Sequence, residues 1–544
     1  MDFKQQTYQL IDDLKLTCTS SGLGNDGNEY KIITQVFLYK FLNDKFGHEV
    51  KQISERLANA ESWELEYASM SQDEIEDLWD ALSPDTPRLK PNHLISFLFN
   101  NQNGDFALLF DNTMTDIADL NIEIFNTHTV EETKIPIFEK LTIFVTDETK
   151  RSDFARALVN KLAKFSFEQV FAEKYDFFSD IFEYLIKDYN NAGGGKYAEY
   201  YTPKSIARVM ARLLVGENPD LHSVQCYDPS AGTGTLLMAL AHQIGEDRCT
   251  IYSQDISQRS NKMLKLNLIL NNLVSSLDNA VQGDTLVSPY HKEDDNVTLK
   301  KFDFIVSNPP FKLDFPDTHE AVAAQTVRFW AGVPNKPSSI NPQKPKMAIY
   351  TCFLQHVVNS LKDGKGKAAI VVPTGFITAK SGIEKRILQR IVDDKIVAGV
   401  VSMPSNVFAT TGTNVSVLFL DKGKTDDNVV LIDASKLGED YKEGTNQKCR
   451  LRDFEINKIV DTFLKKEKVD DFSVVVTFGE IKEKGYSLSA GQYFDIKIDY
   501  VDITEDEFNQ RMNNYKETLA AQFAESHRLE KEIMEHLNSL QFNS

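Results

Sequence analysis

The sequence predicts an α/β protein in which a doubly wound, mainly parallel sheet follows an all-α N-terminal domain and precedes a C-terminal helical tail. From about residue 220, short apolar runs alternate with helical segments, which is typical of strand–helix–strand units. Several runs are apolar throughout, as expected of strands buried on both faces of a sheet. The chain has 544 residues, too many for one hydrophobic core, so we expect several domains.

The first domain is expected over residues 1–163. Helical apolar spacing is found over 2–14, 30–46, 75–82, 93–99 and 153–162. No group of residues here has a catalytic spacing. We therefore interpret this domain as one for packing or interaction.

The core is expected over residues 164–480 and begins with an amphipathic helix at 165–190. The glycine run 193–195 ends that helix, and a tyrosine-rich segment, 196–203, follows it. Pro203 suits the first turn of a helix over 204–214, with Thr202 as its N-cap. The tyrosines are either packing residues or one wall of a ligand site.

Seven strands are expected in the core. They lie at 223–227, 250–254, 280–282, 302–306, 368–372, 396–401 and 416–420, and helices are expected at 236–244, 347–361 and 381–392. The segment 312–346 is too polar and broken for a regular element, which leaves disorder and a substrate-covering loop as alternatives. Beyond residue 421 the chain becomes charged and less regular.

Acidic residues follow the first three strands at their carboxyl ends, where open α/β sheets bind ligands. Asp228 opens the loop 228–235, whose Gly232 and Gly234 let a ligand approach the backbone closely. The loop lacks the third glycine of a dinucleotide fingerprint. Asp255 can accept from ribose hydroxyls, and Asp284 from an adenine amino group. Each acid alone also suits a cap or turn, but the three together predict a nucleoside pocket.

The fourth strand ends in Asn308-Pro309-Pro310-Phe311. The Asn308 amide oxygen and the Pro309 carbonyl are neutral acceptors, and prolines have no N–H group to compete for them. Phe311 adds a flat apolar face. This set suits an exocyclic amino group on a planar ring, although the tetrad alone is equally consistent with an ordinary turn.

The bulk properties exclude some classes of protein. A net charge of -20 is the wrong sign for a broad polyanion-binding surface, so contact with nucleic acid needs a local basic patch or a partner. The five cysteines have neither CxxC spacing nor paired histidines, which argues against a disulfide framework and a zinc site. No signal peptide or apolar run of spanning length is evident, so we expect a cytoplasmic protein without membrane contact.

The tail is expected over residues 481–544. Residues 485–493 form a loop that should close onto the core. Thr504 and Glu507 make a capping box for a last helix that runs to Leu540. Its apolar residues are spaced either for a partner helix or for packing on its own domain.

The glycine loop, the tetrad and the tyrosine segment together resemble those of the γ-group N6-adenine DNA methyltransferases, which use S-adenosyl-L-methionine. The layout of nearly the whole chain is similar to the modification (M) subunit of type I restriction-modification systems. The resemblance implies a Rossmann-like methyltransferase core whose seven-stranded sheet ends in an antiparallel strand. It implies methyl transfer from S-adenosyl-L-methionine to the N6 amine of adenine in DNA, without a metal.

The resemblance also implies roles for single residues. Asp228, Gly232 and Gly234 would hold the methionine part of the cofactor, Asp255 its ribose and Asp284 its adenine. The residues implied to bind the cofactor are Tyr201, Thr202, Pro203, Asp228, Ser230, Gly232, Gly234, Thr235, Asp255 and Asp284.

The implied catalytic residues are Asn308, Pro309, Pro310 and Phe311. Asn308 and Pro309 would accept hydrogen bonds from the target amine, and Phe311 would stack on the flipped adenine. The implied partners are double-stranded DNA, a separate specificity subunit that reads the sequence, and a second M subunit, so that two M subunits join one specificity subunit. An accompanying restriction (nuclease/translocase) subunit is left open.

Two alternatives stand beside this interpretation. The first is an amino-methyltransferase that acts on RNA or on a protein glutamine; Phe311 and the large helical domain weigh against it. The second is a non-catalytic assembly or DNA-binding protein that retains the fold; the intact tetrad and the three acids weigh against it.

Overall fold

The computed structural model describes residues 2–24, 27–171, 180–181, 184–185, 202–217, 220–337, 347–408, 414–443, 446–495 and 503–539. Its contacts divide the chain into two units, Met1–Tyr493 and Phe494–Ser544. The predicted boundaries after residues 163 and 480 stay predictions. Most of the predicted helix at 165–190, the glycine run and Tyr201 lie outside the described residues.

Helices dominate the first 163 residues, as predicted. They are α1 (Phe3–Ser20), α2 (Gly27–Ile53), α3 (Glu55–Ala58), α4 (Trp63–Ala68), α5 (Gln72–Ala81), α6 (Ile95–Asn100), α7 (Phe106–Leu120) and α8 (Glu148–Leu162), with 3-10 turns η1 (Pro91–His93), η2 (Thr142–Phe144) and, just beyond, η3 (Glu168–Val170). The central helix is α2, in which Phe37, Tyr39 and Phe46 are fully buried. Its apolar residues surround the axis because other helices cover it on several sides.

The prediction of an all-α N-terminal domain is wrong in one respect. Strands β1 (Thr127–Thr129) and β2 (Lys134–Ile135) lie in this part of the chain and join the main sheet. β1 pairs in parallel with β5 (Ala280–Gln282), and β2 pairs antiparallel with β1. Strands of two or three residues have little sequence pattern of their own, and their extended shape comes from pairing with the sheet edge.

Within the residues that the structure describes, the main sheet has eleven strands in the order β13-β10-β8-β9-β7-β6-β3-β4-β5-β1-β2, which corrects the predicted count of seven. The seven predicted strands are adjacent within it: β3 (Val224–Asp228), β4 (Cys249–Asp255), β5, β6 (Phe304–Ser307), β7 (Lys367–Pro373), β8 (Val397–Ser402) and β9 (Val415–Asp421). The last of them, β9, runs antiparallel to both β7 and β8, as implied by the resemblance.

The charged stretch after residue 421 is more regular than predicted. β10 (Asn428–Asp433) extends the sheet in parallel with β8, and β13 (Ser473–Thr477) pairs antiparallel with β10. The stretch also contains the hairpin β11 (Glu439–Glu443) and β12 (Asn446–Arg450) and the helices α16 (Asp453–Leu464) and α17 (Phe478–Glu483). The apolar runs of β10 and β13 are short and bordered by charges, so the sheet edge rather than local pattern defines them.

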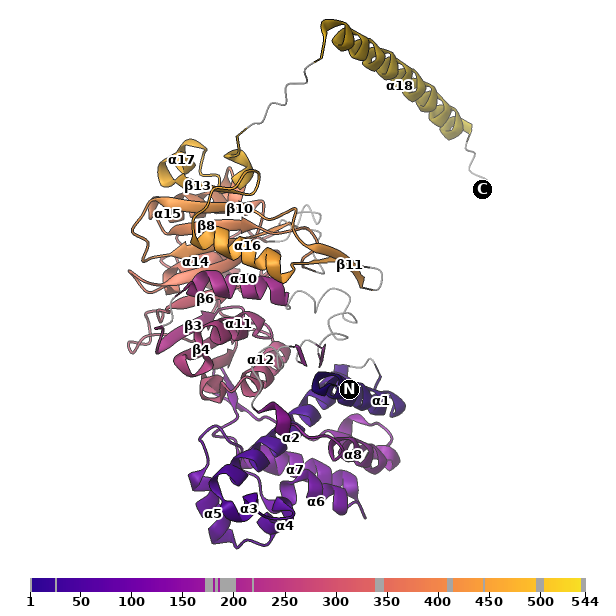
Figure 1. Ribbon diagram of the computed structural model, residues 1–544, viewed down its shortest axis with the longest axis vertical. Helices are drawn as coiled ribbons and strands as arrows, with labels where there is room; N and C mark the ends of the chain where they lie inside the picture. The colour runs from indigo at the N-terminus through magenta and orange to yellow at the C-terminus, as the bar shows by residue number, and fades with distance from the viewer. Residues whose placement is uncertain are drawn as a thin grey trace. The chain divides into compact units, whose positions relative to one another are not determined.

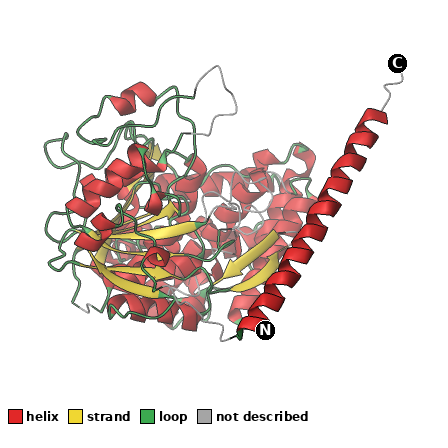
Figure 2. Cartoon of the chain, turned by 90° about the horizontal axis from the view of Figure 1, so that it is seen from above, coloured by secondary structure: helices red, strands yellow, loops and turns green. Residues whose placement is uncertain are grey.

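Helices cover both faces of the sheet (Figure 1). The chain steps from β3 to β4 in one direction along the sheet and from β6 to β7 in the other, so right-handed crossovers place their helices on opposite faces. One group is α10 (Lys204–Val215), α11 (Thr235–Ile244), α12 (Gln258–Leu270) and α16; the other is α14 (Tyr350–Ser360), α15 (Gly382–Asp393) and α17. Figure 2 shows the strands enclosed between helices.

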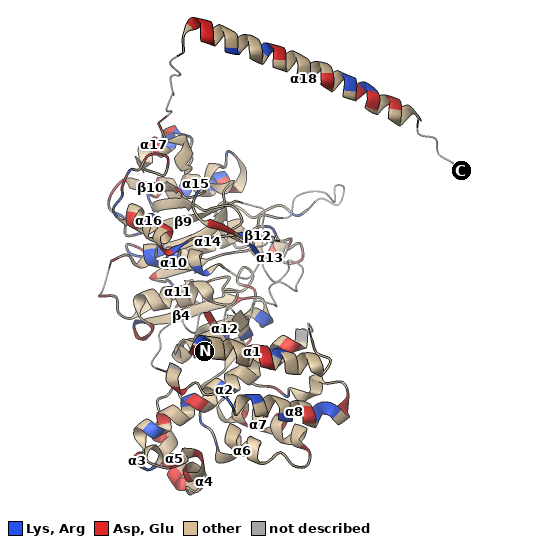
Figure 3. Cartoon of the chain, turned by 45° about the vertical axis from the view of Figure 1, so that its right-hand side comes forward, with Lys and Arg blue, Asp and Glu red and all other residues tan. Residues whose placement is uncertain are grey.

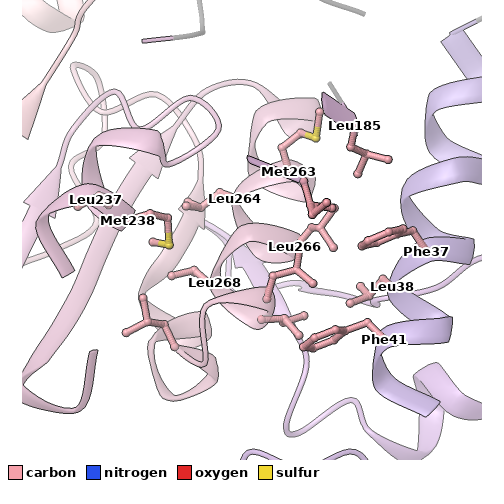
Figure 4. Close-up of a cluster of buried hydrophobic side chains, with 14 of the residues drawn as sticks. Phe37, Leu38, Phe41, Leu185, Leu237, Met238, Met263, Leu264, Leu266 and Leu268 are labelled. Carbon is pink, nitrogen blue, oxygen red and sulfur yellow. The ribbon is translucent and has the colours of Figure 1, made fainter. Parts of the chain in front are cut away.

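A continuous hydrophobic core joins the N-terminal helices to the sheet layer. Side chains of α12, among them Leu266, lie between Phe37 and Phe41 of α2 and the residues of α11 (Figure 4). Polar contacts accompany this packing: Thr127 Oγ1 donates to Asn261 Oδ1 of α12 at 2.9 Å.

Of two connections predicted to be irregular, the segment 312–346 contains a short helix, and the loop 485–493 closes onto the core as predicted. In the segment 312–346, predicted to have no regular element, the short helix α13 (His319–Ala323) forms. The predicted loop at 485–493 does close onto the core, because the Leu488 N–H donates to the Ile377 carbonyl at 2.9 Å and Leu488 is fully buried. The remaining 3-10 turns are η5 (Glu246–Arg248), η6 (Val274–Asn279), η7 (Phe376–Thr378) and η8 (Ala490–Gln492).

The second unit contains one long helix, α18 (Glu505–Ser539). The predicted capping box is confirmed: the Thr504 N–H donates to Glu507 Oε2 at 3.1 Å, and the Glu507 N–H donates to Thr504 Oγ1 at 3.3 Å. Charged residues of both signs are spread along the helix (Figure 3). In the part of the chain that the structure describes, no helix combines the length and apolarity needed to cross a membrane.

Candidate active site

The predicted site residues gather at the carboxyl ends of β3, β4, β5 and β6. β3 and β6 are neighbours, and the chain leaves them toward opposite edges of the sheet. Such a reversal of strand order opens a crevice in which α/β proteins bind their ligands. The fold therefore brings the glycine loop, two further acids and the tetrad to one edge.

The glycine loop takes a conformation that needs its glycines. Gly232 and Gly234 have positive φ angles of 52° and 82°, and Gly234 is the N-cap of α11. A Cβ on Gly234 would lie 2.2 Å from Leu264 Cδ1 of α12. Glycine is thus required at 234 by both the backbone angle and the close approach of α12. Thr235 begins α11, and its hydroxyl lies 3.2 Å from that of Thr233.

Asp255, at the end of β4, holds the glycine loop in place. Its Oδ2 accepts from the Gly232 N–H at 2.8 Å, and its Oδ1 accepts from the Ser257 N–H at 2.8 Å. Burial raises the pKa of this carboxyl, while the two N–H groups act in the opposite direction. Each carboxylate oxygen keeps a further lone pair that can accept a ligand hydroxyl.

Asp228 is buried at the end of β3. Its Oδ1 accepts from the Ser230 N–H at 2.9 Å, and the Ser230 hydroxyl lies 2.7 Å from that of Ser307, which directly precedes the tetrad. Burial raises the pKa of Asp228 to about 8, because the charged form loses its hydration. A ligand cation beside this carboxyl would favour its ionised form.

Asp284, after β5, is half-buried, and its Oδ1 accepts from the Leu286 N–H at 2.9 Å. The next residue, Thr285, donates its hydroxyl to the Pro229 carbonyl in the glycine loop at 2.7 Å. The acidic turn after β5 and the glycine loop are therefore fixed relative to each other. Within the described ranges, none of the carboxylates of Asp228, Asp255 and Asp284 forms an ion pair with Lys or Arg.

The tetrad is oriented by Thr202. Asn308 Nδ2 donates to Thr202 Oγ1 at 3.1 Å, so the other side of the amide carries a free oxygen. Among the described residues, neither Asn308 Oδ1 nor the Pro309 carbonyl accepts a hydrogen bond. The predicted N-cap role of Thr202 is wrong: Pro203 is the N-cap of α10, without a side-chain cap, and the Thr202 hydroxyl contacts Asn308 instead.

The end of the tetrad borders an aromatic group. Pro309 is buried, whereas Pro310 and Phe311 are half-buried. The Phe311 ring meets Tyr350 edge to face at a centroid distance of 6.1 Å, and Tyr350 meets Phe376 in the same way at 6.0 Å. This packing fixes the Phe311 ring and leaves part of it accessible to a planar ligand.

The structure brings together all predicted site residues except Tyr201, which lies outside the described part of the chain. Three supporting residues were not predicted from the sequence: Ser307, Thr285 and Tyr350. They contact Ser230, the Pro229 carbonyl and the Phe311 ring, respectively. Ser307 and Thr285 are each next to a predicted residue, and that adjacency is the one signal that could have pointed to them.

Comparison with known proteins agrees with this geometry. The family model of the N-6 DNA methylases matches residues 173–516. The methylase subunit of the type I restriction enzyme MpnII from Mycoplasma pneumoniae is 29% identical over 351 residues, which cover 63% of this chain and 62% of that protein. The MjaVIII methylase subunit from Methanocaldococcus jannaschii is 24% identical over 505 residues, 90% of this chain and 79% of that protein.

The fold also has a solved counterpart. The crystal structure of the type I restriction-modification system methyltransferase subunit from Streptococcus thermophilus matches with a TM-score of 0.70 and 22% identity, covering 90% of this chain and 99% of that one. The fold is thus a methyltransferase fold with a large, mostly parallel sheet and helical regions. The chain belongs to the N-6 DNA methylase family.

Proposed function

We propose that the chain transfers a methyl group from S-adenosyl-L-methionine to the N6 amine of adenine in DNA. The observation that carries this proposal is the orientation of Asn308. Its amide nitrogen donates to Thr202 Oγ1 at 3.1 Å, which leaves its oxygen, like the carbonyl of the next residue Pro309, without a hydrogen-bond donor among the described residues. Two adjacent acceptors without a donor between them suit an amino group that offers two N–H bonds.

The residues at the sheet edge fit the cofactor in chemical type. When bound, S-adenosyl-L-methionine supplies an activated methyl group on a cationic sulfur. Asp255 has lone pairs for ribose hydroxyls, and half-buried Asp284 offers an acceptor for the adenine amine. Asp228, without a Lys or Arg partner among the described residues, can face the cationic methionine end.

The tetrad would then position the target base. Adenine N6 is inaccessible to an enzyme inside a duplex, so the base must be extruded and held by edge hydrogen bonds and stacking. Asn308 Oδ1 and the Pro309 carbonyl accept from the amine, and Phe311, held by Tyr350, stacks on the ring. Positioning supplies most of the acceleration, since the methyl group is already activated.

We also propose that the chain acts in the cytoplasm as the modification subunit of a type I complex, in which a separate specificity subunit reads the DNA sequence. Relatives named as type I methylase subunits and the net charge of -20, which disfavours DNA reading by this chain alone, support this assignment. Two copies would join one specificity subunit, and a restriction subunit could join the complex. The exposed apolar side chains of α18 would contribute to that assembly.

Transfer of labelled methyl to duplex DNA tests this proposal. The full chain is incubated with labelled S-adenosyl-L-methionine and duplex, with and without the specificity subunit encoded alongside. We expect label on adenine N6 only when the specificity subunit is present.

Other outcomes separate the parts of the proposal. Label transferred by this chain alone would contradict the division of labour with a specificity subunit. Label on RNA or protein glutamine instead of DNA would contradict the proposed substrate. Absence of calorimetric heat with S-adenosyl-L-methionine would favour a non-catalytic role.

A further inference from the structure

A buried arginine lies behind the site, in the segment that follows the tetrad. Arg328 is 7% exposed, and the hydrogen bonds that it donates to described residues all go to neutral acceptors. Nη2 donates to the Thr285 carbonyl at 2.6 Å, and Nη1 donates to the Leu286 carbonyl and to Gln325 Oε1, both at 2.9 Å. Within the described ranges, no carboxylate forms an ion pair with this guanidinium.

The two carbonyls belong to the turn that carries Asp284. The same turn is closed by Asp284 Oδ1 and is joined through the Thr285 hydroxyl to the Pro229 carbonyl. Gln325 supports it from the same side, because Gln325 Nε2 donates to the Leu286 carbonyl at 3.1 Å and to that of Val287 at 3.2 Å. Arg328 and Gln325 therefore fix the position of the backbone that follows Asp284.

The guanidinium Nε is linked, through His356, to the strand that carries Asp228. Arg328 Nε donates to His356 Nδ1 at 3.0 Å, so His356 is neutral and carries its proton on Nε2. His356 Nε2 then donates to the Tyr227 hydroxyl at 3.1 Å, one residue before Asp228. Burial and the nearby guanidinium lower the pKa of His356, which keeps the ring in this neutral form.

A buried guanidinium without a direct ion pair is costly, even though the charge of Asp284 acts on it at longer range, and an apolar residue would anchor the segment as well. A guanidinium can also hold several acceptors at once, because its N–H groups lie in one plane and point in fixed directions. The single ammonium group of a lysine cannot do this. A second arginine, Arg386, binds the same segment without contacting the Asp284 turn within the described ranges and so serves as a comparison. Arg386 of α15 donates twice to the Ala331 carbonyl of the same segment, at 2.9 and 2.7 Å, and among the described residues it has no contact with the Asp284 turn.

We propose that Arg328 is a positioning residue for the adenine end of the cofactor site. It sets the Asp284 turn relative to β3 and so determines how tightly the nucleoside is held. The inference rests on the proposed function, because it assumes that Asp284 receives the adenine of S-adenosyl-L-methionine.

The experiment compares Arg328→Lys and Gln325→Met with Arg386→Lys in the full chain. Arg328→Lys keeps the charge and loses the fork, Gln325→Met loses two hydrogen bonds to the same turn, and Arg386→Lys loosens the same segment away from the turn. The Kd for S-adenosyl-L-methionine is measured by calorimetry. The kcat and the KM values for cofactor and duplex are measured with the specificity subunit added.

We expect Arg328→Lys to raise the Kd and the cofactor KM about tenfold, the effect of losing one hydrogen bond to a charged group, while kcat and the duplex KM stay near the parent values. Gln325→Met should raise the Kd less, by about threefold, since its two bonds to the turn are between neutral groups and the bond that its Oε1 accepts is only one of several that hold the Arg328 guanidinium. Arg386→Lys should bind the cofactor like the parent.

Cofactor binding at parent strength by both Arg328→Lys and Gln325→Met would overturn the inference, as would equal weakening by Arg386→Lys. If Arg328→Lys fails to fold, as judged by circular dichroism, Gln325→Met decides. A parent chain that binds no S-adenosyl-L-methionine would reject the proposed function itself, and the inference with it, before any variant is compared.

Discussion

The loops at the carboxyl edge of the sheet and the terminal helix α18 are built in opposite ways. At the sheet edge, each loop is bonded to another: the Gly232 N–H to Asp255, and the Ser230 hydroxyl to Ser307. In α18 the side-chain bonds seen among the described residues join residues of the helix itself, as between Arg528 and Glu525. The apolar side chains of α18 are exposed, with Phe523 64% accessible.

The two regions obtain their structure from different interactions. The sheet edge is determined by burial and by bonds between residues far apart in sequence. The helix α18 is determined by its cap and local propensity, and its exposed apolar residues are those of an interaction surface. Changes at the edge should therefore affect stability and ligand binding, whereas changes in α18 should affect assembly alone.

The largest expected effect comes from Gly234→Ala. The added Cβ would lie 2.2 Å from Leu264 Cδ1, and the φ of 82° is unfavourable for alanine. We expect a loss of about 3 kcal/mol or more in the free energy of unfolding, from overpacking and backbone strain combined, measured by urea denaturation.

Gly375→Ala is the matched control, because Gly375 has a helical φ of -60° and an added Cβ there would meet no atom within 4 Å. The double variant Gly234→Ala/Leu264→Ala should lose less stability than the sum of the two single losses, because truncating the buried Leu264 removes the close contact. Equal stability of the Gly234 and Gly375 variants would break the claim that close packing determines the loop.

Phe311→Ala should keep cofactor binding and lower methylation about 10- to 100-fold, since stacking on a base contributes roughly 1–3 kcal/mol. The measurement is the rate of labelled methyl transfer with the specificity subunit present. Phe315→Ala, in the same segment but with its ring against His319, is the control and should transfer at nearly the parent rate. Parent activity in Phe311→Ala would refute the stacking role.

Asp228→Asn should alter the pH dependence of stability. The folded pKa of about 8 lies above the ordinary value of 3.8, so between these values the folded chain retains a proton that the unfolded chain releases. This group therefore makes stability fall as pH rises from 4 to 8. The variant should be more stable than the parent by up to about 5 kcal/mol at pH 8, because each pH unit between the two pKa values contributes about 1.4 kcal/mol, and the difference should shrink toward pH 4.

Urea denaturation at several pH values measures this difference, and calorimetry should show weaker cofactor binding in the same variant. A stability difference that does not change with pH would contradict the assigned proton. Stronger apo stability with weaker binding would show that the carboxylate is retained at the edge for ligand binding.

The smallest expected effect on the core comes from deletion of residues 504–544. The thermal midpoint of the core and the Kd for S-adenosyl-L-methionine should stay at the parent values, because the deleted helix belongs to the second unit. Assembly with the specificity subunit, followed by size-exclusion chromatography, should weaken. A truncated chain that assembles fully would remove the interaction role of α18.

Much of the fold could be predicted because the central strands have strong local patterns. Strands such as β7 and β9 are continuous apolar runs buried on both faces, and they formed within one or two residues of their predicted bounds. Strands β1 and β2 could not be predicted, since their few residues become extended only by pairing, β1 with β5 and β2 with β1. Strands β10 and β13, the last two at the other end of the sheet, were hidden by neighbouring charges.

The positions of the candidate site could be predicted from strand ends, but its supporting contacts could not. Asp255 and Asn308 stand next to recognisable strands. The contact between Asn308 and Thr202 joins residues 106 positions apart, and the bonds from Arg328 to the Asp284 turn span more than 40 positions. Contacts at such distances leave no local pattern, so Thr202 was wrongly assigned as a helix cap and Arg328 was missed.

The most direct test of the central claim is methyl transfer by Asn308→Ala, with Thr202→Val as its companion. We expect Asn308→Ala to bind S-adenosyl-L-methionine with the parent Kd and to transfer methyl about 10³-fold more slowly, as when an enzyme loses a key polar group at the reacting atom. Thr202→Val, which only frees the amide to turn, should transfer about tenfold more slowly. Transfer at the parent rate by Asn308→Ala would contradict the account.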